Sequence, residues 1–222
     1  MESKTVKILI VDDHPSQIEG YKIILSYNHG GHIVKTTEAY NCKSAYEIIV
    51  SATESDFDII FLDRSLPGFP EKKLLNGEDL GMLVKRFLPN TKIVMLTSHS
   101  ETFLLYNIIK KIEPAGLMVK SDFSAEELLI AFEKILSGET YYSESVATSI
   151  KELLSRENYL DAINRHIIIL LSQGVKTKSI PEHLNLSQSS VEKRKAQIKD
   201  YLCIEKGTDE DIVREAKRLG FI

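Results

Sequence analysis

Five polar side chains stand at the ends of short apolar runs and could together act on a phosphoryl group. They are Asp12, Asp13, Asp63, Thr97 and Lys120. Carboxylates that lie close together repel one another unless a cation intervenes, and Mg²⁺ prefers such oxygen ligands. One carboxylate can then become a phosphoryl acceptor, while a hydroxyl and an ammonium bind the added oxygens. These residue types predict a metal-dependent acceptor, provided that the fold brings them together.

The apolar runs that precede these residues predict buried parallel strands. Each run is short and rich in Ile and Val, without strict alternation, which is typical of strands covered on both faces. In an open parallel sheet the ligand crevice lies outside the carboxyl ends of the strands, so the five side chains should converge there. The runs are Val6–Val11, Phe57–Leu62, Lys92–Thr97 and Gly116–Lys120.

Segments with helical spacing of apolar residues alternate with these strands as far as residue 137. Ser124 opens the last of the helices with a capping box, and Gly138 ends it. Five strands and five helices in alternation predict a doubly wound, flavodoxin-like α/β domain with a five-stranded parallel sheet of order 2-1-3-4-5. The other expected helices and the weak second strand are 15–25, 44–50, 77–87 and 32–36.

The chain changes character after residue 137. Residues 138–158 are rich in Ser, Thr and Glu, and we interpret them as a linker with some helix. Residues 159–222 contain no convincing strand, and they predict a small all-α domain of four helices. Within it a short helix, a tight connection and a longer helix from Ser187 to Leu202 form a helix-turn-helix arrangement. The expected domains are therefore 1–137 and 159–222, joined by the linker.

Charge is unevenly distributed along the 222 residues, whose net charge is −4. Residues 159–222 carry 11 basic and 9 acidic side chains, whereas the preceding residues carry 17 and 23. The acidic amino-terminal part suits cation binding, and the mildly basic carboxy-terminal part suits binding of a polyanion. There is no signal-peptide pattern, and no apolar stretch approaches the roughly 20 residues that span a bilayer. We therefore expect a cytoplasmic protein with no membrane partner.

Residues 5–137 resemble the receiver domain of bacterial two-component signalling. The resemblance rests on Asp12-Asp13, on Asp63 with Leu66-Pro67 after it, on Thr97-Ser98 and on Lys120. It implies that Asp63 accepts phosphate from a sensor histidine kinase, and that Thr97 and Lys120 sense the phosphoryl group. It also implies that Asp13, Asp63 and the backbone carbonyl of Ser65 hold Mg²⁺, with Asp12 acting partly through water.

Two features depart from the receiver pattern. Receivers usually carry an aromatic residue three positions before the lysine, where this chain has Leu117, so the usual relay from Thr97 to the surface is in question. The segment after Asp63 is also longer than is typical, because residues 68–75 intervene. We interpret residues 68–75 as a tolerated surface insertion, with a partner-selective lip over the site as the alternative.

Residues 160–222 resemble the LuxR-type four-helix DNA-binding domain of the NarL branch of response regulators. The matching positions are Leu160, Ile167, Leu170, Leu171, Gly174, Thr177-Lys178, Ile180, Leu184, Leu186-Ser187, Val191, Ile198 and Leu202. The resemblance places Glu192, Lys193 and Ala196 toward the bases, and Lys178, Arg194 and Lys199 at the phosphates. Taken alone, such a charged run would be a solvated helix face. Glu192 stands where the family often has a lysine, which implies altered specificity or weaker binding.

Together these features indicate a response regulator that acts as a transcription factor, not as an enzyme. A kinase would phosphorylate Asp63, and the phosphorylated homodimer would bind double-stranded DNA at paired half-sites. One alternative is a phosphatase with an aspartyl nucleophile, but Asp63-Arg64-Ser65 lacks the second carboxylate that would support it. The other alternative is a regulator whose carboxy-terminal domain docks protein instead of DNA.

Overall fold

The computed structural model describes residues 4–156, 161–202, 204, 207–218 and 221–222. The chain divides into two compact units, Met1–Ile150 and Lys151–Ile222. The division falls inside the segment that we expected to be a linker. The expected domain start at residue 159 and the matching residue Leu160 lie outside the described residues.

The first unit is built on a parallel sheet of order β2-β1-β3-β4-β5-β6. The register pairs Val11 with Leu62, Asp63 with Leu96, and Thr97 with Val119, so the carboxyl ends of β1, β3, β4 and β5 lie level with one another. That alignment is what brings the polar residues at or directly after the ends of these strands to one edge. The strands are β1 Thr5–Val11, β2 Ile33–Ala39, β3 Ile59–Asp63, β4 Lys92–Thr97, β5 Gly116–Val119 and β6 Tyr141–Tyr142.

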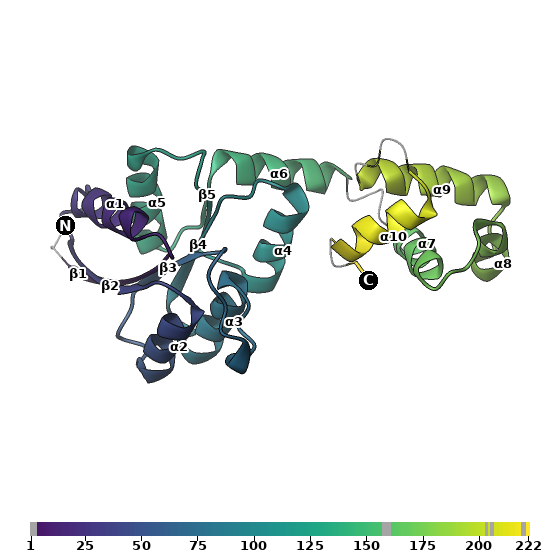
Figure 1. Ribbon diagram of the computed structural model, residues 1–222. Helices are drawn as coiled ribbons and strands as arrows, with labels where there is room; N and C mark the ends of the chain where they lie inside the picture. The colour runs from purple at the N-terminus through teal and green to yellow at the C-terminus, as the bar shows by residue number, and fades with distance from the viewer. Residues whose placement is uncertain (1–3, 157–160, 203, 205–206, 219–220) are drawn as a thin grey trace. The chain divides into compact units, whose positions relative to one another are not determined.

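Helices cover both faces of this sheet (Figure 1), which explains why its strands are apolar on both sides. Ile8 and Ile10 pack on one face against α1 and α5, whereas Leu9 and Val11 pack on the other against α2, α3 and α4. Asn76 caps α3 through the N–H groups of its first turn. The helices are α1 Pro15–Ser26, α2 Cys42–Ser51, α3 Gly77–Phe87, α4 Thr102–Ile112 and α5 Ala125–Ser137.

The expected doubly wound domain and its order 2-1-3-4-5 are confirmed, but the sheet has six strands instead of five. The additional strand β6 pairs with β5 through Gly116 and Leu117. It is followed by α6, Glu144–Arg156, in which Val146 is fully buried. The expected capping box at Ser124 is present, and Gly138 ends α5 in the left-handed conformation at φ 93°. Residues 138–156 therefore hold regular structure that belongs in part to the first unit.

The described part of the second unit is helical. Ser187 caps α9 by accepting the Ser190 N–H, and Asn185 makes the preceding turn with φ 53°. Ile180, Val191 and Ile198 are fully buried, so α8 and α9 share a core as a helix-turn-helix requires. None of the helices in the described residues has the length and hydrophobicity needed to cross a bilayer. The elements are α7 Ala162–Ser172, η3 Thr177–Ser179, α8 Ile180–Leu184, α9 Gln188–Tyr201 and α10 Asp209–Arg218.

Candidate functional site

Lys120 joins two deeply buried carboxylates of the first unit. Its Nζ lies 2.6 Å from Asp12 Oδ2 and 3.1 Å from Asp63 Oδ1. Asp12 is 0% exposed and Asp63 is 3% exposed, so both carboxylates depend on protein groups for their stabilisation. Side chains that are 108 and 57 residues from Lys120 along the chain thus meet it at one point, where the sequence predicted a site.

Asp12, Asp13 and His14 form a group of possible metal ligands whose donor atoms lie within 4.8 Å of one another. The backbone N–H of His14 donates to Asp12 Oδ1 at 2.9 Å. His14 Nδ1 lies 2.9 Å from Asp13 Oδ1, yet that oxygen is buried and has no hydrogen bond of acceptable geometry within the described residues. A buried carboxylate oxygen left in this state fits a cation site. His14 was not predicted, although its place directly after the acidic pair could have suggested it.

Two effects of opposite sign act on the Asp63 carboxyl. Burial raises its pKa above the usual range, and the nearby charge of Asp12 adds to that rise. The ammonium of Lys120 and a hydrogen bond from the Ser65 backbone act in the other direction but do not cancel the effect of burial. The carboxylate is therefore weakly solvated and depends on nearby positive charge to remain ionised.

Thr97 and Lys120 are linked to each other through the backbone. The Lys120 N–H donates to the Thr97 carbonyl at 2.7 Å, and Thr97 Oγ1 accepts the His99 N–H at 3.0 Å. Thr97 is fully buried. The two residues predicted to sense the phosphoryl group thus lie, hydrogen-bonded to each other, at the start of the loops that follow β4 and β5.

Gly77 packs closely against the backbone of Asp63, a role that the sequence did not reveal. A Cβ at residue 77 would lie 1.9 Å from the carbonyl oxygen of Asp63. The Gly77 N–H donates to the Arg64 carbonyl at 2.9 Å, so α3 begins directly against the end of β3. Only glycine allows this approach.

We expect Gly77→Ala to destabilise the first unit by about 3 kcal/mol, because the clash is with backbone and cannot be relieved by a side-chain rotation. Urea unfolding would measure the change. Gly20→Ala is the matched control, since a Cβ there meets nothing within 4 Å and alanine is the better helix former. Equal stability of the two variants would contradict this role of Gly77.

Residues 68–75 form an ordered hairpin rather than a free loop. Phe69 and Leu74 pair as an antiparallel bridge, and Leu74 is buried. The Phe69 ring packs edge-on against Tyr46 of α2 at 5.7 Å between ring centroids. The insertion is thus attached to α2 by its own apolar contacts.

Leu117, where receivers usually have an aromatic residue, is fully buried in β5.

The candidate DNA contacts of the second unit divide into two groups. Arg194 Nη1 lies 2.6 Å from Asp161 Oδ2 and 2.9 Å from Asn164 Oδ1. Lys199 Nζ donates to the Gly207 carbonyl at 2.6 Å. These two cations therefore hold α9 within the unit. The exposed candidates are Lys178, Glu192, Lys193 and Ala196.

Lys195 is a buried cation that we did not expect. Its Nζ lies 2.6 Å from Asp209 Oδ1 and 2.9 Å from Thr177 Oγ1, which links α9 to α10 and to η3. Although burial opposes ionisation of Asp209, these contacts hold its pKa below the usual value. Lys195 is thus a structural residue, and its ammonium group is not exposed for contact with a nucleic acid.

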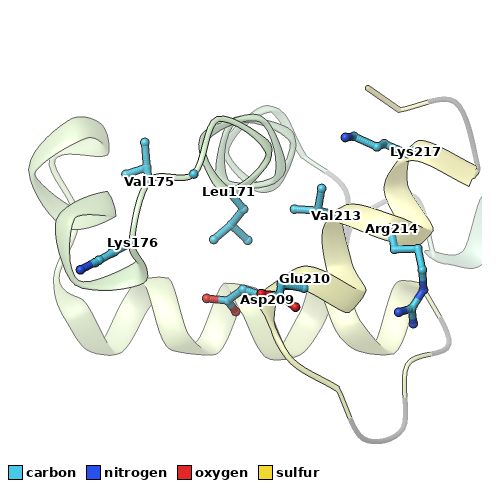
Figure 2. Close-up of a pocket in the computed structure, with 9 residues that line it drawn as sticks. Leu171, Val175, Lys176, Asp209, Glu210, Val213, Arg214 and Lys217 are labelled. Carbon is cyan, nitrogen blue, oxygen red and sulfur yellow. The ribbon is translucent and has the colours of Figure 1, made fainter.

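A pocket of about 560 Å³ lies in the second unit, where Leu171 of α7 and Val213 of α10 face each other (Figure 2). Cationic and acidic side chains surround this apolar centre, so its charge favours neither sign. None of the residues predicted from the sequence as binding residues lines it. The lining residues are Leu171, Gly174, Val175, Lys176, Asp209, Glu210, Val213, Arg214 and Lys217.

Comparison with known proteins places the chain among signalling proteins. The family model of the response regulator receiver domain matches residues 8–133, more than half of the chain. The oxygen regulatory protein NreC of Staphylococcus epidermidis is 26% identical over 206 residues, covering 87% of this chain and 89% of that protein. The response regulator RcsB of Salmonella typhimurium has a similar fold, with a TM-score of 0.70 at 20% identity over 96% of this chain and 99% of that one. RcsB of Salmonella enterica serovar Typhimurium bound to a promoter with the phosphomimetic BeF₃⁻ gives a TM-score of 0.62 at 19% identity, over 95% and 97% of the two chains.

Proposed function

The chain belongs to the family of response regulator receiver domains, and from this premise we propose that it is a transcription factor of the NarL/LuxR type, phosphorylated on Asp63 by a sensor histidine kinase. The observation that carries the proposal is the convergence of Asp12, Asp63 and Lys120 within hydrogen-bonding distance. The experiment that tests it is phosphorylation of the purified chain by acetyl phosphate, with the Asp63→Asn variant beside it.

In the proposed reaction a carboxylate oxygen of Asp63 attacks the phosphorus of the kinase phosphohistidine. A P–O bond forms as the P–N bond breaks, and the imidazole leaves. Asp12, Asp13 and Asp63, with the carbonyl of Ser65, would hold a Mg²⁺ ion that neutralises charge on the phosphoryl oxygens. Lys120 holds the acceptor in place beforehand, and with Thr97 it binds the transferred group afterwards.

The proposed division of labour follows the expected domain boundaries. Residues 1–137 receive the phosphoryl group, residues 159–222 bind double-stranded DNA, and residues 138–158 connect them. Phosphorylation would shift the population toward a homodimer that engages paired half-sites in the cytoplasm. The helix-turn-helix core of α8 and α9 supports this proposal, and a similar fold in promoter-bound RcsB agrees with it.

In the proposed DNA complex, α9 lies in the major groove. Lys193, Ala196 and Glu192 would face the bases, because all three are exposed. Lys178 of η3, which is also exposed, would meet a phosphate. Arg194 and Lys199 would add phosphate contacts, while their internal contacts orient the helix.

We expect Lys193→Ala to weaken DNA binding about tenfold, since one contact to a base or phosphate is lost. Fluorescence anisotropy would measure the affinity, with a duplex that the phosphorylated chain enriches from a random library. Lys217→Ala removes an exposed lysine from α10 of the same unit and is the control. If both variants bound like the wild type, α9 would not be the recognition helix.

A second candidate function is docking of a protein by the carboxy-terminal unit. It is favoured by the exposed carboxylate of Glu192 on α9 and by the internal contacts of Arg194 and Lys199. Absence of any DNA binding at low salt by the phosphorylated chain would favour this candidate. Salt-dependent DNA binding would exclude it as the main function.

A further inference from the structure

The turn that contains Lys120 is hydrogen-bonded to the segment formed by β6 and α6. Ser143, which is 2% exposed, accepts the Val119 N–H on its Oγ at 3.1 Å. Its own N–H donates to the Leu117 carbonyl at 3.1 Å. Ser143 therefore continues the pairing of β6 with β5 up to the residue before Lys120.

Asp122 makes a second attachment, two residues after Lys120. Its Oδ2 accepts the Ser145 N–H at 2.8 Å in the first turn of α6, where a carboxylate is favoured by the helix dipole. Its Oδ1 is buried and has no hydrogen-bond partner in the described part of the chain. The Asp122 N–H donates to the Val119 carbonyl. A shift of this turn must therefore move the start of α6 or break this bond.

α6 is also in contact with α4, the helix that follows the loop after Thr97. Val146 and Ile150 of α6 pack in the same core as Leu105 and Ile108 of α4. Ser149 Oγ lies 3.5 Å from Thr102 Oγ1 at the first residue of α4. The turn that follows Lys120 and the helix α4 that follows Thr97 thus both contact α6.

Residue 117 is the position at which this chain lacks the aromatic residue that receivers usually have. Leu117 has no ring that could turn between a buried and an exposed position, but its partner in the neighbouring strand is Tyr142. Tyr142 is half-buried in the core that contains Leu117, and burial raises the pKa of its hydroxyl. The aromatic side chain beside this position therefore comes from β6, the strand that directly precedes α6.

We propose that the segment of residues 141–150, held by Ser143 and Asp122, is the output element of the receiver unit. It transmits a shift of the Lys120 turn along α6. This inference rests on the proposed phosphorylation of Asp63 and names its route of regulation. α6 continues to Arg156, past the end of the first compact unit at Ile150. Ser143 and Asp122 are positioning residues, since they act through the Lys120 turn and not on the phosphoryl group.

The test is hydrogen exchange of the full chain with and without acetyl phosphate and Mg²⁺, with intact mass recorded on the same samples. In the wild type we expect exchange over residues 143–150 to change by about fivefold on phosphorylation, the factor that corresponds to one helix cap gained or lost. The double variant Asp122→Ala, Ser143→Ala should take up phosphate normally, which also shows that it is folded, but lose this change.

Glu144→Ala is the matched control, because it removes an exposed acidic residue from the first turn of the same helix. It should respond like the wild type. An unchanged exchange over residues 143–150 in the phosphorylated wild type would overturn the inference, as would a full response in the double variant. Failure of the wild type to take up phosphate would show first in the mass and would overturn the proposed function together with this inference.

Discussion

The Asp63→Asn variant takes up no phosphate from acetyl phosphate, whereas the wild-type chain gains the mass of one phosphoryl group. The asparagine side chain has the size and shape of aspartate, so the unit keeps its fold. Its amide, however, is not a nucleophile toward phosphorus. Removal of one negative charge beside Asp12 also leaves Lys120 with a single ion pair at 2.6 Å. Intact-mass spectrometry after a timed incubation with Mg²⁺ measures the result.

Asp200→Asn is the control for this experiment, because Asp200 is an exposed aspartate of α9. It should be phosphorylated like the wild type. Phosphate uptake by Asp63→Asn at the wild-type rate would place the acceptor elsewhere, and the proposed function would then fail.

The Lys120→Met variant loses about 3 kcal/mol of stability at neutral pH without Mg²⁺, because two buried carboxylates are left without their shared cation. Burial already raises the pKa of Asp63 against the effect of Lys120, and removal of the lysine raises that pKa further. A carboxyl whose pKa is higher in the folded state favours folding as the pH falls. The variant should therefore regain stability on acidification, until other carboxylates are protonated.

Thermal unfolding with and without Mg²⁺ would measure this effect. A divalent cation replaces the missing charge, so Mg²⁺ should stabilise Lys120→Met more than the wild type. Lys35→Met, at an exposed lysine of β2, is the control and should change stability by less than about 0.5 kcal/mol. Equal stability of Lys120→Met and the wild type, with no additional effect of Mg²⁺, would show that the ion pairs of Lys120 contribute little.

The sheet and its site residues were predictable because their signals are local and repeated. β4 and α3 have the predicted bounds, since a run of buried apolar residues defines the first and Asn76 caps the second. Residues that directly follow parallel strands meet at one edge whatever the loops do. Asp12, Asp63 and Lys120 could therefore be placed together from the order of the strands alone.

Two kinds of feature could not be read from the sequence. A strand of two residues such as Tyr141–Tyr142 is too short to show a period, so the sequence predicts only a linker at β6. The role of a cation in a charged run depends on acidic groups that are distant in sequence. Arg194 pairs with Asp161 and Lys195 with Asp209, and neither pairing has a local signal. Gly77 gave no local signal either, since its close contact is with the backbone of Asp63 at the end of β3.

Mapping the phosphorylated residue tests the central claim most directly. The wild-type chain would be treated with acetyl phosphate and Mg²⁺, reduced with borohydride to trap the acyl phosphate, digested, and sequenced by mass spectrometry. We expect a single modified residue, Asp63, and no modification when a chelator removes Mg²⁺. Modification of another residue, or labelling of Asp63 that persists without a divalent cation, would contradict a metal-dependent acceptor formed by Asp12, Asp13, Asp63 and Lys120.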